Sequence, residues 1–252
     1  MIRVKSEKDI ECMRESGKIL AATLKLIEKE IRPGISTKYL DKIANEYIIS
    51  RGGKPSFLRL YGFPASICSS IDDIVVHGIP RESDILQEGQ IIGVDCGVKY
   101  KGFHTDAART FAVGEINDEK KKLIEVTEKS FFEGIKDLKA NDRVGDIGAR
   151  VQNYVEKHGF SVVRDLVGHG VGKEMHEDPS IPNFGRMGLG EKIPANCTLA
   201  IEPMVNAGGY EVVFNGMWDV RTKDGRPSAH YENTVLVTEN GVEILTIDNV
   251  GE

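Results

Sequence analysis

The sequence contains few cysteines and no long hydrophobic segment. Only four of its 252 residues are cysteine, and no two are spaced as C-x-x-C, which argues against a zinc ribbon or a redox pair. No apolar run approaches the length of a membrane span. Residues 1–7 are polar and lack the hydrophobic region of a secretory signal. We therefore expect a cytoplasmic protein with reduced thiols and no membrane association.

Two common catalytic signatures are also missing. The glycine-rich residues 168–172 lack the G-x-x-x-x-G-K-[ST] pattern of a phosphate loop, and no G-x-S-x-G motif marks a serine hydrolase. The net charge of −6 argues against a general nucleic-acid binder, so we expect no nucleic-acid specificity. No linker or low-complexity segment divides the chain. We expect one catalytic domain over residues 1–252.

Hydrophobic spacing predicts a repeated order of helices followed by strands. Apolar residues at helical intervals predict helices over residues 7–31, 37–51, 118–138 and 144–157. Ser6, followed by Asp9, forms the N-cap pattern of the first helix. Because the strands run consecutively, we expect an α+β fold with an antiparallel or mixed sheet and helices on one face. The predicted strands are residues 67–70, 74–77, 91–98, 103–113, 161–166, 198–205, 211–213, 218–220, 232–237 and 242–245.

Four carboxylates and one histidine stand in apolar or glycine-rich stretches, where a charge is costly. Burying an ionised carboxylate without a partner is very unfavourable, and four in one core would also repel one another. Two divalent cations would neutralise the four charges, and oxygen ligands with one imidazole suit hydrolytic metals. The pattern predicts a two-metal hydrolase. The residues concerned are Asp95, Asp106, His169, Glu202 and Glu232.

The two aspartates are expected to meet on a β-hairpin. If the hairpin turns at Tyr100-Lys101, Asp95 lies directly opposite Asp106, and a cation must bridge the two charges. A bulge at Gly102 would instead shift the pairing by one residue. The alternative is a pair of unrelated aspartates at a strand edge. Cys96 should point to the opposite face of the sheet and pack as a buried thiol.

The remaining candidates also have ordinary structural explanations. His169 lies in a glycine-rich segment, and taken alone it fits a structural histidine in a flexible turn. His77 and His176 each stand near a loop and are, singly, more often structural. Glu202 and Glu232 could form salt bridges, although no lysine or arginine lies in either stretch. His169 and His176, seven residues apart near one loop, could instead divide the work, one binding metal and the other donating to a substrate carbonyl.

Taken together, the motifs resemble those of the type I methionine aminopeptidases in their short bacterial form, along essentially the whole chain. The resemblance implies the pita-bread fold of the M24 metallopeptidases, with two pseudo-symmetric αβ halves around a dinuclear metal centre. The matching segments are Val76-His77-Gly78-Ile79-Pro80, Asp95 with Asp106, Gly168-His169-Gly170-Val171-Gly172, His176-Glu177-Asp178-Pro179, Ile201-Glu202-Pro203-Met204 and Tyr231-Glu232-Asn233-Thr234.

The resemblance also implies a role for each ligand. Asp95 would chelate one metal, His169 and Glu202 would bind the other, and Asp106 and Glu232 would bridge them. A water activated by the two metals would attack the first peptide bond. The two divalent ions could be Co, Mn, Fe, Zn or Ni, since the same ligands accept several.

Catalytic and pocket residues follow from the same resemblance. Glu202 would shuttle a proton, His176 would stabilise the oxyanion, and His77 would help position the substrate. The pocket departs from the family pattern, because Phe57 and Leu60 replace a cysteine and a tyrosine. Other departures are Phe63 for a tyrosine, Met175 for an aromatic residue, His230 for a glutamine and Asn233 for a histidine. The expected apolar substrate pocket comprises Phe57, Leu60, Phe63, Met175 and Trp218.

The resemblance predicts an enzyme that removes N-terminal methionine from nascent proteins, preferably before a small second residue. Its expected partners are N-terminal peptides of nascent proteins, met at the ribosome, and the expected state is a monomer. Two alternatives stay open at this point. One is a related peptidase acting on Xaa-Pro bonds, and the other is a non-catalytic peptide-binding module on the same fold.

Overall fold

The computed structural model describes residues 1–247 and shows two successive blocks of helices and strands. The predicted order, helices before strands in each block, is confirmed. The first block contains α1 (Glu7–Glu30), α2 (Thr37–Ser50), β1 (Lys54–Pro55), the short 3-10 helix η1 (Leu60–Gly62), β2 (Ile67–Ile71), β3 (Ile74–Val76), β4 (Ile91–Tyr100) and β5 (Phe103–Ala112). The second contains α3 (Asp118–Ile135), α4 (Val144–Lys157), β6 (Ser161–Val162), β7 (Val167–Gly170), β8 (Glu177–Pro182), β9 (Cys197–Ile201), β10 (Met204–Asn206), β11 (Val212–Asn215), β12 (Asp219–Thr222), β13 (Ser228–His230), β14 (Asn233–Val237) and β15 (Val242–Ile244).

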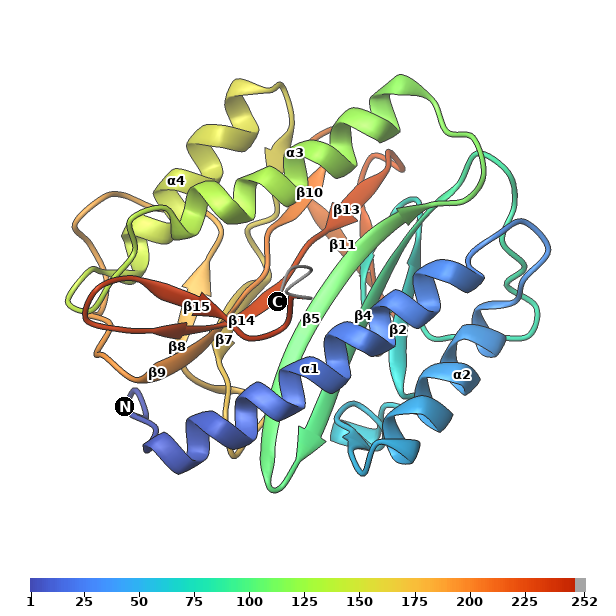
Figure 1. Ribbon diagram of the computed structural model, residues 1–252. Coiled ribbons are helices and arrows are strands. Elements are labelled where there is room, and N and C mark those ends of the chain that lie inside the picture. The colour runs from blue at the N-terminus through green and yellow to red at the C-terminus, as the bar shows by residue number, and fades with distance from the viewer. Residues whose placement is uncertain (248–252) are drawn as a thin grey trace.

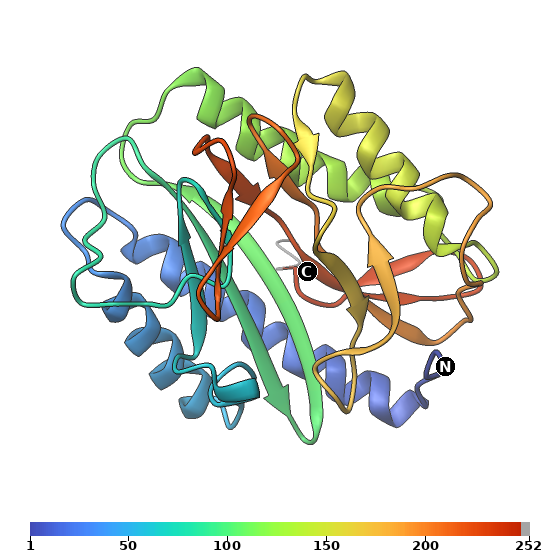
Figure 2. The same cartoon turned by 180° about the vertical axis from the view of Figure 1, so that it is seen from behind.

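The helices cover one side of the strands. Figure 1 shows α1 crossing in front of β4 and β5, with α3 and α4 in front of the second block, and Figure 2 shows the strands exposed on the opposite side. Apolar side chains fill the space beneath each helix pair, for example Leu20 and Val94 in the first block and Val151 and Leu199 in the second. Cys96 is fully buried in the first of these cores, as its strand position predicted.

Helix ends follow local capping chemistry. The Ser6 side chain accepts from the Asp9 backbone N–H at 3.3 Å, and the Asp9 carboxylate accepts from the Ser6 backbone at 3.1 Å, so the predicted capping box forms. The third helix ends at Ile135, earlier than the predicted residue 138. Asp137 has a φ of 57°, a left-handed conformation that cannot continue a right-handed helix.

The β4–β5 hairpin turns one residue later than expected: Lys101 and Gly102, rather than Tyr100 and Lys101, form its two-residue loop. Their φ values of 46° and 92° are those of a type I′ turn, which matches the twist of an antiparallel pair. Asp106 therefore lies opposite Gly97, so the predicted direct pairing with Asp95 is wrong. The register differs by two residues, which keeps both aspartate side chains on the same face, diagonal to each other.

Sequence reasoning missed or misplaced several strands because they are short or contain glycine or proline. Short strands β1, β7, β8 and β13 were not predicted. The predicted strand over 198–205 is interrupted at Glu202-Pro203 and becomes β9 and β10. The predicted strand over 161–166 stops at Val162.

The two blocks are joined edge to edge where β5 meets the start of β14. Ala108 and Glu232 exchange backbone hydrogen bonds of 3.3 and 2.9 Å. On one side of this pair, the Thr234 hydroxyl bonds both the N–H and the C=O of Asp106. On the other side, the Thr110 hydroxyl bonds both the C=O and the N–H of His230. This seam places Asp106 and Glu232, which are far apart in the sequence, on neighbouring backbone segments.

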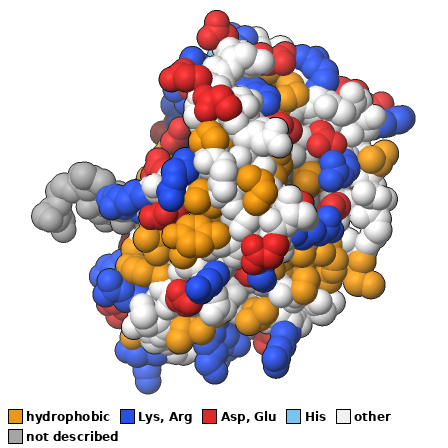
Figure 3. Space-filling view, turned by 90° about the vertical axis from the view of Figure 1, so that its right-hand side faces the viewer, with side chains coloured by type: hydrophobic (Ala, Val, Ile, Leu, Met, Phe, Trp, Pro, Cys, Tyr) orange, Lys and Arg blue, Asp and Glu red, His pale blue; other side chains and the backbone are white. Residues whose placement is uncertain are grey.

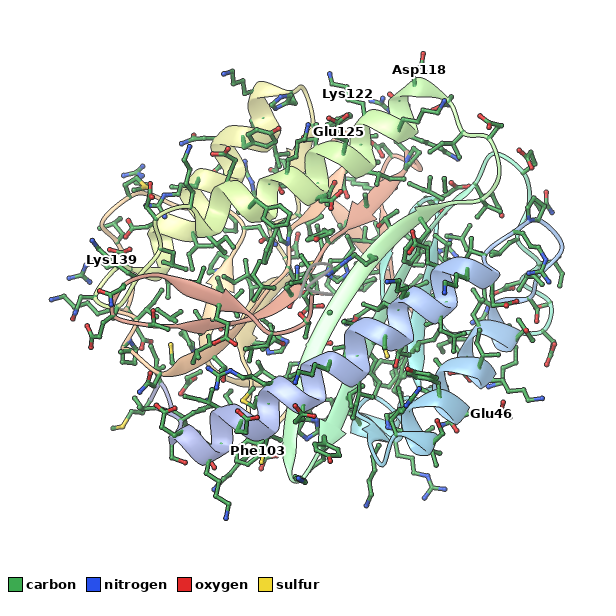
Figure 4. The ribbon with its side chains drawn as sticks, in the orientation of Figure 1. Glu46, Phe103, Asp118, Lys122, Glu125 and Lys139 are labelled. Carbon is green, nitrogen blue, oxygen red and sulfur yellow. The ribbon has the colours of Figure 1, made fainter. Side chains whose placement is uncertain are left out.

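The outer surface carries charges of both signs, with hydrophobic side chains between them on the face shown in Figure 3. Side chains such as Glu46 on α2 and Lys122 and Glu125 on α3 point outward from the helices in Figure 4. On the face shown in Figure 3, lysine and arginine are interspersed with aspartate and glutamate. Within residues 1–247, none of the helices has the length and apolar character needed to cross a bilayer.

A glycine in α1 permits close packing against the end of the chain, and its replacement should destabilise the fold. A Cβ at Gly17 would lie 1.9 Å from the Leu245 carbonyl oxygen, so Gly17→Ala must displace backbone. Alanine's better helix propensity, about 1 kcal/mol, does not offset this, and we expect a net loss of about 1–2 kcal/mol in urea unfolding. The exposed Lys18→Ala should change stability by less than about 0.5 kcal/mol. Equal stability of the two variants would contradict the prediction.

Candidate active site

The five predicted ligands converge on one pocket, although they come from both blocks. Their elements are β4 for Asp95, β5 for Asp106, β7 for His169, the β9–β10 junction for Glu202 and the residue before β14 for Glu232. All five line a cavity of about 290 Å³. The seam between β5 and β14 brings the two blocks' ligands together at this point.

Some oxygen atoms of the buried carboxylates receive no hydrogen bond from the described residues. Asp106 is 4% exposed and Glu232 is 1% exposed. One oxygen of each, and one of Asp95, is buried without a hydrogen-bond partner among residues 1–247. Such unpaired acceptors are rare in folded proteins, and a bound cation explains them.

The distances among these groups suit ligands arranged around a shared centre. His169 Nε2 lies 3.6 Å from Asp106 Oδ2 and 3.6 Å from Glu202 Oε1, longer than a good hydrogen bond. Ligand atoms of Asp106, His169 and Glu232 all lie within 4.8 Å of one another. The donor set, oxygen-rich with one imidazole, therefore fits a divalent metal.

Burial and mutual repulsion change the protonation of the acids. Burial, and then the neighbouring carboxylates, raise the pKa of Asp95 and of Glu232 well above the usual range. Burial also raises the pKa of Asp106, although the adjacent His169 partly opposes it. For His169, burial lowers the pKa, but the carboxylates of Asp106 and Glu202 more than offset this and raise it.

His169 is held in a strand, not in the flexible turn that was its structural alternative. It lies in β7 between β8 and β9, and glycines flank it. A Cβ at Gly168 would come within 2.5 Å of the Ala200 carbonyl oxygen, and one at Gly170 within 2.1 Å of that of Asp178. Nδ1 of His169 donates to the Gly170 carbonyl at 2.9 Å, which leaves the Nε2 lone pair facing the carboxylates.

The other two predicted histidines line the same cavity and are neutral near pH 7. His77 follows β3 with a φ of 61°, and burial lowers its pKa. Burial and the nearby His169 lower the pKa of His176 to about 4. The ring of His176 lies edge-on to that of His169, with centroids 4.5 Å apart, and the Tyr61 ring stacks on it at 5.9 Å.

One end of the cavity is apolar. Phe57, Leu60, Phe63 and Trp218 line it as predicted, and the Phe63 and Trp218 rings meet edge to face with centroids 5.1 Å apart. Met175 does not line the cavity; it is 3% exposed and packs behind Phe57 in the same apolar cluster.

Sequence reasoning missed several residues of this cavity. Cys68 lies directly opposite Asp95 in the β2–β4 pairing, so its side chain shares that face. The alternation of β2 could have identified it. His230, which the sequence marked only as a departure, does not line the cavity, but its Nε2 lies 3.5 Å from Glu202 Oε2 and 4.0 Å from Glu232 Oε2, which do. The unpredicted lining residues are Tyr61, Cys68, Val76, Leu166, Val167 and Met204.

Comparison with known proteins identifies the class of this fold and site. The chain matches the model of metallopeptidase family M24 over residues 11–239. It is 54% identical to a methionine aminopeptidase of Clostridium perfringens over 98% of this chain and 99% of the relative. It is 47% identical to methionine aminopeptidase 1 of Bacillus subtilis, again over 98% and 99% of the two chains.

A solved structure agrees with these relatives. The crystal structure of a methionine aminopeptidase from Thermotoga maritima superposes with a TM-score of 0.97 at 42% identity, over 98% of this chain and 100% of that one. The chain therefore belongs to metallopeptidase family M24. The predicted resemblance to methionine aminopeptidases, the α+β pita-bread fold and the metal-dependent peptidase class are confirmed.

The raised pKa values predict that metal binding releases protons. Asp95 and Glu232 hold protons to higher pH than ordinary carboxyl groups, and a cation must displace them, so the apparent metal affinity should rise with pH. Calorimetric titration of chelator-treated protein with Mn²⁺, at one pH in two buffers of different ionisation enthalpy, should give different heats. Identical heats in both buffers would show that the acids are already ionised.

Proposed function

We propose that this protein removes the N-terminal methionine from nascent proteins by hydrolysing their first peptide bond, preferably when the second residue is small. The single observation that carries this proposal is the convergence of all five ligand-type side chains on a cavity with an apolar end. The similarity to methionine aminopeptidases along 98% of the chain supports it. We further propose that the whole chain forms one catalytic domain that acts as a cytoplasmic monomer and meets its substrates at the ribosome.

The proposed cofactor is a pair of divalent cations. Asp95 would hold one, His169 and Glu202 the other, and Asp106 and Glu232 both. Four carboxylates against two dications give a neutral set. When bound, such ions lower the pKa of water and polarise a carbonyl group.

The side chains around the ligands divide the remaining work. The Glu202 carboxylate would take a proton from the attacking water and return it to the departing amine. His176 is neutral at pH 7 because its pKa is about 4, so its N–H would donate to the scissile carbonyl oxygen as negative charge develops there. His77 lines the same cavity and would help position the substrate amide.

The apolar end of the cavity would accept the first side chain of the substrate. Phe57, Leu60, Phe63 and Trp218 offer an apolar surface that suits an unbranched thioether side chain. Contacts between a pocket and one substrate side chain discriminate between similar substrates by about 1–3 kcal/mol of transition-state binding. Selectivity for methionine therefore depends on this wall. The free amine would lie among the carboxylates, which explains action at the chain end only.

Peptide assays under metal control test the proposal. Met-Gly peptides should be cleaved faster than Xaa-Pro peptides; chelation should abolish cleavage, and Mn²⁺, Fe²⁺ or Co²⁺ should restore it. Asp106→Asn should remove activity, because an amide replaces a carboxylate shared by both cations. A preference for Xaa-Pro peptides would assign a different M24 activity. Failure of every metal-loaded preparation to cleave would favour the non-catalytic peptide-binding alternative.

Truncating the pocket wall should alter selectivity for the first residue. Phe63→Ala removes a ring that contacts Trp218, so kcat/KM for Met-Gly should fall by about tenfold or more, while the ratio of Phe-Gly to Met-Gly cleavage should rise. Phe160→Ala is the matched control: Phe160 is 8% exposed and belongs to the core of the second block, away from the cavity. If both variants keep the wild-type ratio, Phe63 does not contact the first side chain.

A further inference from the structure

A buried ion pair connects the start of the chain to the segment that carries His176. Lys5 Nζ lies 2.8 Å from Glu177 Oε2, and the two side chains are 6% and 2% exposed. The partners are 172 positions apart in the sequence. Burial raises the pKa of Glu177, but the hydrogen bond and charge of Lys5 outweigh this and lower it, so the carboxylate is ionised at pH 7.

The N-terminal arm, residues 1–5, is itself attached to the second block. The Lys5 backbone N–H donates to the Asn196 carbonyl at 2.7 Å, and Val4 forms a β-bridge with Cys197. Figure 1 shows the N-terminus beside β8 and β9. Arg3 adds a second cationic contact to Glu177, at 3.2 Å.

Glu177 organises the segment from Gly172 to His176. Its Oε1 accepts from the Glu174 backbone N–H at 3.2 Å, which closes a short loop around the carboxylate. A Cβ at Gly172 would lie 2.7 Å from the Lys5 side chain and 2.9 Å from the Glu177 carboxylate, so the segment folds closely around the pair. Phe103, labelled in Figure 4 near the first turn of α1, lines a cavity with the same arm and Glu177.

The ring of His176 depends on this segment for its position. No hydrogen bond from residues 1–247 reaches the ring, and its two ring contacts are with His169 and Tyr61. Tyr61 is 74% exposed and offers little restraint. The backbone next to His176 is therefore its main support, and Glu177 is the adjacent residue.

We propose that Lys5 and Glu177 are positioning residues that hold His176 over the candidate active site. A buried ion pair contributes little net stability, because desolvation offsets its attraction, but its directed bonds fix the geometry of what it joins. The proposal rests on the proposed role of His176 at the scissile carbonyl. Displacement of a catalytic group by about 1 Å can lower a rate by about a hundredfold.

Kinetics of matched variants of the full-length, Mn²⁺-loaded enzyme test the proposal. Lys5→Met and Glu177→Gln should each lower kcat for Met-Gly by at least about tenfold with KM within about twofold, since His176 acts mainly in the transition state. Lys5→Arg, which keeps the charge, should recover most of the lost kcat. Arg14→Met is the control, because Arg14 forms a two-bond ion pair of 2.8 Å with Glu243 far along the chain from His176. It should lower the unfolding temperature and leave kcat unchanged.

A second readout does not depend on activity. Amide hydrogen exchange at residues 173–177 should be faster in Lys5→Met and Glu177→Gln than in wild type and unchanged in Arg14→Met. If Lys5→Met does not fold, Glu177→Gln, which retains shape and an acceptor oxygen, decides the outcome. The proposal would be overturned if folded Lys5→Met and Glu177→Gln variants kept the wild-type kcat and exchange rates. It would also be overturned if Arg14→Met lost as much kcat as these two variants. An inactive wild-type protein would refute the proposed function, while exchange would still test the positioning.

Discussion

The seam between β5 and the start of β14 is the constraint on which the candidate site depends. The seam is short. Its central pair, Ala108 and Glu232, is joined by hydrogen bonds between the backbone groups of both residues. At each end of the seam, a threonine hydroxyl bonds both the N–H and the C=O of the facing residue. In a regular sheet, the backbone of a neighbouring strand would make these two hydrogen bonds. Because threonine offers both a donor and an acceptor, each satisfies a backbone N–H and C=O that would otherwise be buried unpaired.

Arg109 supports the same seam from behind. Its guanidinium donates to the carbonyls of Ala108 and Glu232 and to the Asn233 side chain, and it lies 4.2 Å from the centre of the Tyr231 ring. The amide oxygen of Asn233 also accepts from the Thr246 hydroxyl at 3.0 Å. Asn233 therefore supports the joint between the blocks and does not line the cavity.

The buried acids make the metal-free fold sensitive to pH. Asp95 and Glu232 have raised pKa values in the folded chain, whereas unfolded carboxyl groups titrate near pH 4. Between these values the folded form binds more protons than the unfolded form, so these groups reduce stability as the pH rises through that window. A cation reverses the effect because it binds only the ionised, folded arrangement. Metal binding and stability of the fold are thus coupled through the same residues.

Sequence reasoning located the residues that gather at the cavity more accurately than it predicted how their strands pair. Acids within apolar stretches, such as Asp95 and Glu232, are conspicuous because isolated buried charges are so unfavourable. The pairing of Asp95 with Asp106 was misplaced because the turn depends on two residues with positive φ, one of them the non-glycine Lys101. The β7 strand was hidden because its glycines, which strand propensity disfavours, are required by close backbone contacts. No local pattern could relate residues 172 positions apart, such as Lys5 and Glu177.

The candidate metal ligands and the apolar wall of the cavity come from different parts of the molecule. The ligand set spans both blocks and depends on the seam, so changes there affect the entire centre. The apolar wall comes largely from one segment, where Phe57, Leu60 and Phe63 lie within seven positions and surround η1. Trp218, the residue before β12, meets Phe63 from the second block. Substitutions at Phe57 and Leu60 can therefore reshape the apolar wall without moving a candidate metal ligand.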